Sequence, residues 1–212
     1  MAKAKICGLT TPETVAAALD GGAAFLGFNF FDRSPRVLAP EAAARLVAPV
    51  KGRARTVAVT VDPDDALLDR LMATLNPDLI QLHGKETPAR AAAVAARTGA
   101  EVIKVLPVSE SSDLNAAREF ETAAAHMMFD TKPPKDAEMP GGHGVAFDWT
   151  ILKGQRFARP WFLAGGLNPW NVAEALDTSG APLADVSSGV ERGPGVKDPA
   201  LISAFLEAVR RA

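Results

Sequence analysis

The chain has 212 residues, of which 48% are hydrophobic and 23% are charged, and its formal net charge is −2. This length can bury one sizeable core, and it is short but sufficient for one barrel of alternating strands and helices. Charges of both signs are dispersed along the sequence without a run of one sign. We therefore expect neither nucleic acid nor an anionic membrane surface as the main partner.

No apolar stretch is long enough to span a bilayer, and the N-terminal segment leads directly into a predicted strand rather than into the apolar region of a signal peptide. The single cysteine, Cys7, excludes an internal disulfide and is typical of a reducing compartment. These features predict a cytoplasmic protein.

Short apolar runs alternate with Ala- and Leu-rich amphipathic segments along the whole sequence. The predicted strands are residues 4–7, 25–28, 56–61, 79–82, 102–105, 127–130, 161–164 and 184–187. The predicted helices are residues 12–20, 40–48, 63–75, 88–98, 114–124, 149–152, 169–177 and 199–211. Strict alternation predicts a parallel sheet, and eight units predict an α/β fold in which that sheet closes into one (β/α)8 TIM barrel. We expect it to form a single domain over residues 1–212.

Prolines mark several predicted helix starts. Pro12, Pro63, Pro169 and Pro199 each follow a Thr, Asp or Asn that can cap a helix N-terminus. The one long irregular segment, residues 132–145, is rich in Pro and Gly and follows the sixth predicted strand. We interpret it as an active-site lid or binding loop, with a disordered surface excursion as the alternative.

Gly- and Ser-rich turns follow the last two predicted strands, within residues 163–167 and 185–191. Such turns leave backbone amides unobstructed at the start of the next helix, where they suit a dianionic phosphate. In a (β/α)8 barrel the loops after strands seven and eight form the usual phosphate site. The two turns together therefore predict a phosphorylated small-molecule ligand.

Chemically useful side chains occur where predicted strands end, which is the active face of such a barrel. Cys7 supplies a thiol, Asp130 a carboxylate and Arg36 a guanidinium. This set suits acid–base chemistry on a phosphorylated, acidic small molecule. With three histidines in the chain and no His, Asp or Glu cluster at ligand spacing, we expect no metal site.

Each of these residues also has a structural interpretation. A lone cysteine is usually a small buried hydrophobe, an Asp after a strand often caps the next segment, and a loop Arg is usually a surface charge. Three local features of the sequence favour a functional role instead. Gly8 follows Cys7 at the end of the first strand, no helix starts after Asp130, and Pro35 stiffens the chain before Arg36. His83 is by type more often a structural hydrogen-bonding residue than a catalyst.

Nearly the whole chain resembles the phosphoribosylanthranilate isomerase family of tryptophan biosynthesis. The motifs that carry the resemblance are Lys5-Ile6-Cys7-Gly8-Leu9-Thr10, Gly27-Phe28, Ser34-Pro35-Arg36, Gln81-Leu82-His83-Gly84, Phe129-Asp130-Thr131-Lys132, Gly141-Gly142-His143-Gly144, Phe147-Asp148-Trp149, Gly165-Gly166-Leu167-Asn168-Pro169 and residues 185–191. Most of them follow a predicted strand, in the family's order.

The resemblance implies an isomerase that converts N-(5-phosphoribosyl)anthranilate into 1-(2-carboxyphenylamino)-1-deoxyribulose 5-phosphate. This Amadori rearrangement needs neither a metal nor an organic cofactor. By resemblance, Asp130 is the general acid that opens the ribose ring, Cys7 is the general base at C2′, and Arg36 holds the anthranilate carboxylate. The other expected substrate-binding residues are His83, Gly165, Gly166, Asp185, Ser188 and Gly189. We do not count Lys5, two residues before Cys7 on the same strand, among the groups that lower the pKa of the thiol.

Two alternative functions stay open. A phosphosugar isomerase of histidine biosynthesis would have paired Asp residues at the ends of strands one and five, where this chain has Cys7 and residues 105–108. A barrel that binds a phosphorylated metabolite without turnover, as a sensor or scaffold, is disfavoured by Cys7 and Asp130. The sequence predicts a monomer or a homodimer without deciding between them.

Overall fold

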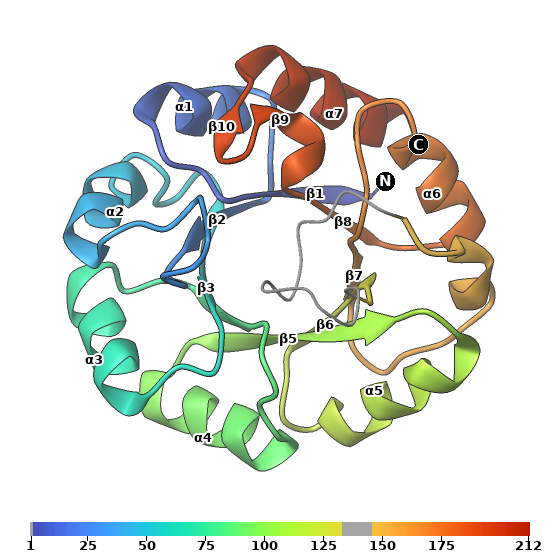
Figure 1. The fold of residues 1–212 in the computed structure, drawn as a ribbon, viewed down its shortest axis with the longest axis horizontal. Coiled ribbons are helices and arrows are strands. Elements are labelled where there is room, and N and C mark those ends of the chain that lie inside the picture. The colour runs from blue at the N-terminus through green and yellow to red at the C-terminus, as the bar shows by residue number, and fades with distance from the viewer. Residues whose placement is uncertain (1, 133–145) are drawn as a thin grey trace.

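The computed structural model describes residues 2–132 and 146–212. Eight parallel strands pair in chain order, and β8 pairs with β1, so the sheet closes into a barrel (Figure 1). The strands are β1 (Lys3–Cys7), β2 (Phe25–Asn29), β3 (Arg55–Thr60), β4 (Leu79–Leu82), β5 (Glu101–Val108), β6 (His126–Thr131), β7 (Trp161–Leu163) and β8 (Leu183–Val186). The predicted TIM barrel is confirmed.

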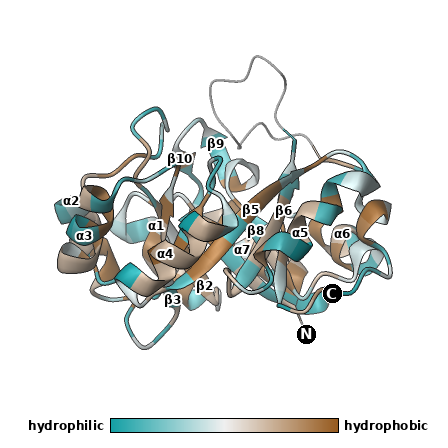
Figure 2. Cartoon of the chain, turned by 90° about the horizontal axis from the view of Figure 1, so that it is seen from below, coloured by the Kyte–Doolittle hydropathy of each residue, from teal (hydrophilic) through white to brown (hydrophobic). Residues whose placement is uncertain are grey.

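The helices lie around the outside of this sheet (Figure 1). In the described part of the chain the α-helices are α1 (Pro12–Asp20), α2 (Pro40–Val47), α3 (Asp65–Thr74), α4 (Pro88–Thr98), α5 (Asn115–Phe120), α6 (Val172–Ser179) and α7 (Pro199–Arg211). Figure 2 shows apolar strands inside and polar residues on the outer helices. None of these helices is both long and apolar enough to cross a membrane.

Three predicted helices have both bounds correct, α1, α4 and α7, and a proline after a capping residue predicted the starts of α1 and α7. Thr11 accepts a hydrogen bond from the Thr14 amide, and Asp198 accepts one from the Ala200 amide. Each cap satisfies a backbone donor that the first turn leaves without a helical partner.

The same signal is wrong for α3, which begins at Asp65 rather than at Pro63. Asp64 is the capping residue, because its Oδ1 accepts the Leu67 amide at 2.8 Å. Asp62, the expected cap, adopts a positive φ of 45° and accepts the Lys85 amide at 2.7 Å. Either Asp62 or Asp64 is placed in the sequence to cap α3, and the contact of Asp62 with Lys85 leaves Asp64 as the cap.

Apart from α2, which ends one residue early at Val47, three other predicted helices differ in the structure. In place of the predicted helix 114–124, the structure has a 3₁₀ turn, Ser111–Leu114, followed by the short α5. The segment Trp149–Leu152 is a 3₁₀ turn rather than an α-helix. The last of the three, α6, begins at Val172 rather than Pro169, because Asn168 Oδ1 accepts the amides of Trp170 and Asn171 in a turn before it.

Apolar side chains fill the N-terminal end of the barrel. The rings of Phe25, His126 and Phe162 pack edge to face, with centroids 5.2 to 6.1 Å apart. Phe25 and His126 are the first residues of their strands, so this cluster closes one end of the interior. Polar side chains inside the barrel collect toward the opposite, C-terminal end.

A short hairpin, β9 (Glu191–Gly193) and β10 (Val196–Lys197), follows β8 and is absent from the sequence prediction. It lies on the side of the barrel opposite the two chain ends (Figure 2), above the C-terminal ends of the strands. A Cβ on Gly195, in its turn, would lie 2.6 Å from the Pro35 carbonyl oxygen. The hairpin therefore packs directly on the loop that carries Arg36.

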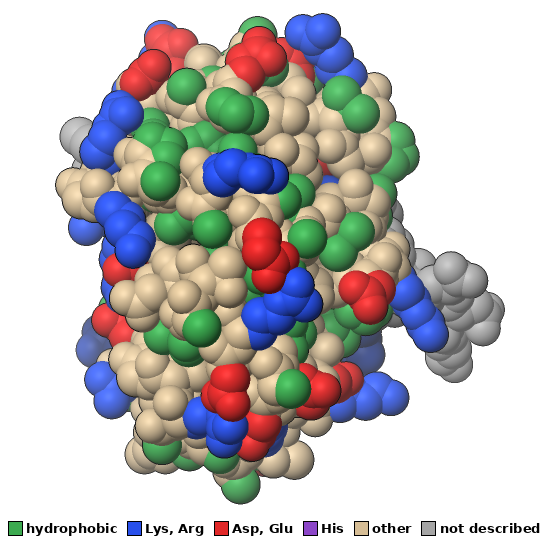
Figure 3. Space-filling view, turned by 90° about the vertical axis from the view of Figure 1, so that its left-hand side faces the viewer, with side chains coloured by type: hydrophobic (Ala, Val, Ile, Leu, Met, Phe, Trp, Pro, Cys, Tyr) green, Lys and Arg blue, Asp and Glu red, His purple; other side chains and the backbone are tan. Residues whose placement is uncertain are grey.

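Lys and Arg alternate with Asp and Glu over the face that carries α2 and α3 (Figure 3). Many of these charges pair across neighbouring helices, as Arg97 does with Asp69 on α3. Charges mixed in this way agree with the dispersed pattern of the sequence and create no single-sign field on this face.

Candidate active site

The predicted catalytic residues lie at the C-terminal ends of their strands. Cys7 ends β1, Asp130 is the second-last residue of β6, and Asp185 lies in β8 between them. Because β7 and β8 separate β6 from β1 around the ring, Cys7 and Asp130 enter the same rim from different sides. This is the rim where (β/α)8 barrels do chemistry.

Cys7 is buried beside a fully buried lysine. A Cβ on Gly27 would lie 3.2 Å from both Cys7 Sγ and Lys5 Nζ, so the glycine leaves room for the two groups to approach. Lys5 Nζ also donates to Asp185 Oδ1 at 2.8 Å. Lys5 was not assumed to act on the thiol, but its ammonium lies beside Cys7 and acts to lower the pKa of the thiol.

Burial and charge act in opposite directions on this thiol. Burial raises the pKa of Cys7 above its ordinary value, while the ammonium groups of Lys5 and Lys197 lower it and the Asp185 carboxylate raises it. Burial lowers the pKa of Lys5, but Asp185 and Cys7 outweigh that effect and raise it overall. The ammonium of Lys5 therefore opposes the effect of burial on the thiol.

Asp130 is buried and is held from two sides. Its Oδ1 accepts the Thr131 amide at 2.8 Å, and its Oδ2 lies 3.4 Å from His83 Nε2. The other ring nitrogen of His83 lies 3.4 Å from the Gln81 amide nitrogen. The structure thus brings His83 beside the predicted acid, with Gln81 behind it.

The predicted phosphate turns pack against the site and against each other. A Cβ on Gly165, whose φ is +84°, would lie 2.2 Å from Thr131 Oγ1 and 3.0 Å from Asp130 Oδ1. A Cβ on Gly189 would lie 1.9 Å from the Leu167 carbonyl oxygen. Only glycine permits either approach. The two turns therefore form one surface that includes the predicted residues Gly165, Gly166, Ser188 and Gly189.

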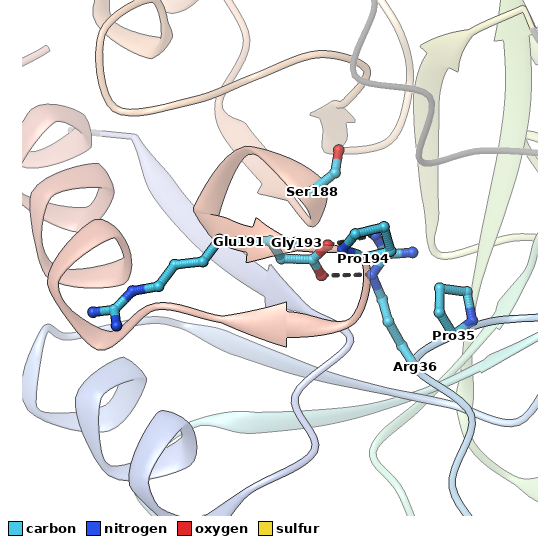
Figure 4. Close-up of a pocket in the computed structure, with 7 residues that line it drawn as sticks. Pro35, Arg36, Ser188, Glu191, Gly193 and Pro194 are labelled. Atoms are coloured by element: carbon cyan, nitrogen blue, oxygen red, sulfur yellow. Dashed lines mark hydrogen bonds and ion pairs between the residues drawn. The ribbon is translucent and has the colours of Figure 1, made fainter.

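Arg36 is buried and already paired. Its Nε donates to Glu191 Oε1 at 2.7 Å and its Nη2 to Glu191 Oε2 at 2.8 Å, as Figure 4 shows. A Cβ on Gly8 would lie 2.5 Å from Arg36 Cδ, so the arginine crosses the chain directly after Cys7. Glu191 is the last residue of the 185–191 motif, but neither it nor Lys197 was a predicted site residue.

A cavity of about 320 Å³ opens beside this pair. It is lined by Pro35, Arg36, Ser188, Glu191 and residues 192–194 (Figure 4). The cavity therefore joins the predicted carboxylate-binding residue to one of the predicted phosphate turns.

A further buried ion pair lies near β4 and β5. Lys104 Nζ donates to Glu86 Oε2 at 2.6 Å and to the Gly84 carbonyl oxygen at 2.7 Å. Within residues 2–132 and 146–212, no group of three or more His, Cys, Asp or Glu side chains is placed to hold a metal ion. The lid interpretation of residues 132–145 and the motif containing His143 fall almost wholly outside the described residues.

Comparison with known proteins decides the family. The sequence profile of N-(5'phosphoribosyl)anthranilate (PRA) isomerase matches residues 4–208. The chain belongs to this family of isomerases, which act in tryptophan biosynthesis. A relative from Caulobacter vibrioides, named N-(5'-phosphoribosyl)anthranilate isomerase, is 68% identical over 210 residues, covering 99% of this chain and 96% of the relative.

Solved structures of the family share the fold over the full chain. The phosphoribosyl anthranilate isomerase of Thermotoga maritima superposes with a TM-score of 0.89 at 33% identity, covering 100% of both chains. Another isomerase structure holds reduced 1-(o-carboxyphenylamino)-1-deoxyribulose 5-phosphate and superposes with a TM-score of 0.86 at 31% identity, again over 100% of both chains. A further Thermotoga maritima structure contains monomers derived from a dimeric isomerase.

Proposed function

We propose that this protein isomerises N-(5-phosphoribosyl)anthranilate to 1-(2-carboxyphenylamino)-1-deoxyribulose 5-phosphate, with Asp130 as general acid and Cys7 as general base. The observation that carries the proposal is a carboxyl and a thiol at one barrel rim, beside two glycine turns, in a chain that is 68% identical to a relative of that name. No metal or organic cofactor is part of the proposed chemistry.

The first step opens the sugar. Asp130 gives its proton to the ribose ring oxygen as the C1′–O bond breaks, and the anilino nitrogen lone pair forms the C1′=N bond of a Schiff base. The Thr131 amide, which donates to Asp130 Oδ1 at 2.8 Å, fixes the carboxyl. His83, 3.4 Å from the other carboxyl oxygen, fixes it from the opposite side.

The second step moves a proton from C2′. The Cys7 thiolate takes the C2′ proton, the bonding electrons form the C1′=C2′ bond, and the Schiff-base nitrogen becomes an amine. The resulting enol-amine then tautomerises to the ketone. Because burial raises the pKa of the thiol, Lys5 beside it supplies the positive charge that stabilises the thiolate when it forms.

Substrate groups are assigned to the surrounding residues by their chemistry. Backbone amides of the Gly165-Gly166 and Ser188-Gly189 turns bind the phosphate, and Arg36 binds the anthranilate carboxylate. The Asp185 oxygen not taken by Lys5 accepts from a ribose hydroxyl. Whether the active species is a monomer or a homodimer stays a prediction, although a Thermotoga maritima relative is described as dimeric.

Replacing the two proton-transfer groups and the arginine separately tests this assignment. We expect Cys7→Ser and Asp130→Asn each to lower kcat by roughly 10²- to 10⁴-fold, the usual contribution of a general acid or base. Arg36→Ala should mainly raise KM, because it removes a binding group rather than a proton-transfer group. The measurement is the disappearance of the fluorescent anthranilate substrate.

The outer-helix variant Arg97→Ala controls for general damage and should keep the parent's kinetics. Equal activity in Cys7→Ser and the parent would remove the base assignment. Binding of the reduced product analogue without any turnover by the parent would instead favour a sensor or scaffold. Turnover of the histidine-pathway phosphosugar alone would favour the other isomerase.

A further inference from the structure

The pairing with Glu191 uses only part of the Arg36 guanidinium. Two of the five N–H donors of the guanidinium are used by the two carboxylate oxygens, at 2.7 and 2.8 Å, which leaves three donors on Nη1 and Nη2. That outer edge has the right shape for a second carboxylate. The pair as a whole is neutral, however, so it has little attraction for another anion.

Lys197 supplies the missing charge. Its Nζ donates to Glu191 Oε1 at 2.6 Å, the same oxygen that accepts from Arg36 Nε. The side chain of Lys197 is fully buried. Arg36, Glu191 and Lys197 together, which we call the carboxylate triad, therefore carry one net positive charge. A bound carboxylate would bring the cluster to neutrality.

The surrounding backbone fixes the triad in place. The Gly195 amide donates to Glu191 Oε2 at 3.2 Å, and the same glycine packs on the Pro35 carbonyl oxygen. Lys197 Nζ also donates to the Ser187 carbonyl oxygen at 2.9 Å, so the hairpin is tied to the end of β8. The arginine is thus held by a preformed frame rather than by a flexible loop.

Glu191 keeps its charge in this frame. Burial raises the pKa of its carboxyl, but the hydrogen bond from Arg36 and the charge of Lys197 outweigh burial and lower the pKa overall. Burial lowers the pKa of Lys197, and Glu191 opposes that shift. The pKa of Lys197 is lowered overall, because the charge of Arg36 acts in the same direction as burial. Glu191 is the member that favours the charged forms of both cations.

We infer that Glu191 and Lys197 are positioning residues that make Arg36 selective for a carboxylate on the aromatic ring of the substrate. Glu191 fixes the guanidinium plane, and Lys197 supplies the net positive charge. This inference rests on the proposed function, because it assumes that the anthranilate carboxylate meets Arg36. It extends the proposal to two residues of a hairpin that the sequence did not predict.

The test compares two substrates that differ only in the carboxyl group, N-(5-phosphoribosyl)anthranilate and N-(5-phosphoribosyl)aniline. The readout is the ratio of their kcat/KM values. Effects of Lys197 on the nearby thiol act on both substrates and cancel in this ratio. We expect Lys197→Met to lower the ratio at least about tenfold and Lys197→Arg to restore much of it.

A double variant separates charge from mere structural support. Lys197→Met with Glu191→Gln leaves Arg36 as the only charge of the triad, so the net charge returns to the parent's value. Arg36 loses its ionic partner in this variant, so the thermal midpoint is measured beside the kinetics to establish that the protein is folded. We expect it to recover part of the ratio lost in Lys197→Met. A ratio still at the single variant's value would overturn the role given to charge.

Lys104→Met is the matched control, because Lys104 also donates to a buried glutamate at 2.6 Å. It should lower the thermal midpoint at least as much as Lys197→Met, because Glu86 loses its cation, and leave the substrate ratio unchanged. A parent-like ratio in Lys197→Met, or an equal loss in Lys104→Met, would overturn the inference.

Binding measurements keep this inference separate from the proposed reaction. The probes are reduced 1-(o-carboxyphenylamino)-1-deoxyribulose 5-phosphate and its phenylamino counterpart without the carboxyl, titrated by calorimetry. Preference for the carboxyl probe in the parent, and its loss in Lys197→Met, would support the triad even if neither substrate turned over. Equal affinity for both probes in the parent would end the inference whether or not the protein is an active isomerase.

Discussion

The two ends of the barrel interior differ in chemistry. At the N-terminal end, the rings of Phe25, His126 and Phe162 pack edge to face. At the C-terminal end, Lys5 pairs with Asp185 beside Cys7, and Arg36 and Lys197 share Glu191. One end is packed and apolar, while the other holds buried charges that face one another.

This difference separates the parts of the barrel that stabilise it from those that react. Burying a large ring removes apolar surface from water and stabilises the fold directly. A buried ion pair adds little net stability, because desolvation offsets its Coulomb attraction. Charges are therefore expected inside a barrel only where chemistry or binding requires them, and here they gather at the rim that carries Cys7 and Asp130.

Removing a ring from the apolar end should give the largest change in stability. Phe162 is fully buried between Phe25 and His126. We expect Phe162→Ala to lower the free energy of unfolding by about 3–5 kcal/mol, because it deletes buried surface and leaves a cavity. The kcat of the folded fraction should stay close to the parent's. Urea denaturation and steady-state kinetics on the same preparation measure both effects.

The complementary variant is Cys7→Ser, which changes the reactive end of the barrel and leaves the apolar end intact. Cys7→Ser exchanges a single atom at the reactive end, so it should abolish most activity while changing the urea midpoint little. A large loss of kcat in Phe162→Ala, or a stability loss in Cys7→Ser equal to that of Phe162→Ala, would contradict the separation of the two ends.

The histidine in the apolar cluster predicts a smaller effect that depends on pH. Burial lowers the pKa of His126 below its ordinary value of 6.5, although Glu101 opposes the change. The unfolded chain therefore binds a proton at a higher pH than the folded chain does. Stability should be level above about pH 6.5 and fall as the pH decreases below it, with a slope of at most about 1.4 kcal/mol per pH unit, the limit for a single proton.

His126→Phe removes this titration and keeps a ring in the cluster, so its stability should fall less over the same range. Urea titrations between about pH 5 and 7.5 measure this difference in stability. They stay above the range in which the neighbouring Glu101 carboxylate is protonated. The hydrogen bond from Arg55 holds the pKa of Glu101 below its ordinary 4.5, so its contribution is lost only in more acid solution. Parallel stability curves for the parent and His126→Phe would show that His126 does not titrate as described.

The barrel was predictable because its signals are local and repeated. Each strand is a short apolar run, and a Pro after a capping Thr or Asp fixes the starts of α1, α4 and α7. The errors occur where a tertiary contact chooses between two local options. At α3, Asp62 bonds to the Lys85 amide from the next loop, which leaves Asp64 to cap the helix.

The site was partly predictable for a related reason. Cys7, Asp130 and Asp185 could be found because each lies in a strand at its C-terminal end. Lys5 could have been found too, because residues two apart on a strand point to the same face, so it shares the barrel interior with Cys7. Glu191 and Lys197 were missed, since their link to Arg36 depends on a hairpin packing against a loop about 155 residues earlier in the chain.

The smallest change in stability is expected for an exposed ion pair between outer helices, whose N–O distance equals that of the Lys197–Glu191 pair. Arg97 Nη2 lies 2.6 Å from Asp69 Oδ2, the separation also found between Lys197 and Glu191, but both partners are exposed. Water and salt screen the exposed charges, whereas the buried Lys197–Glu191 pair is shielded from both. We expect Arg97→Ala to leave the urea midpoint unchanged within error, at low and at high salt. A loss as large as that of Lys197→Met would show that burial does not set the strength of these pairs, and the contrast between rim and surface would fail.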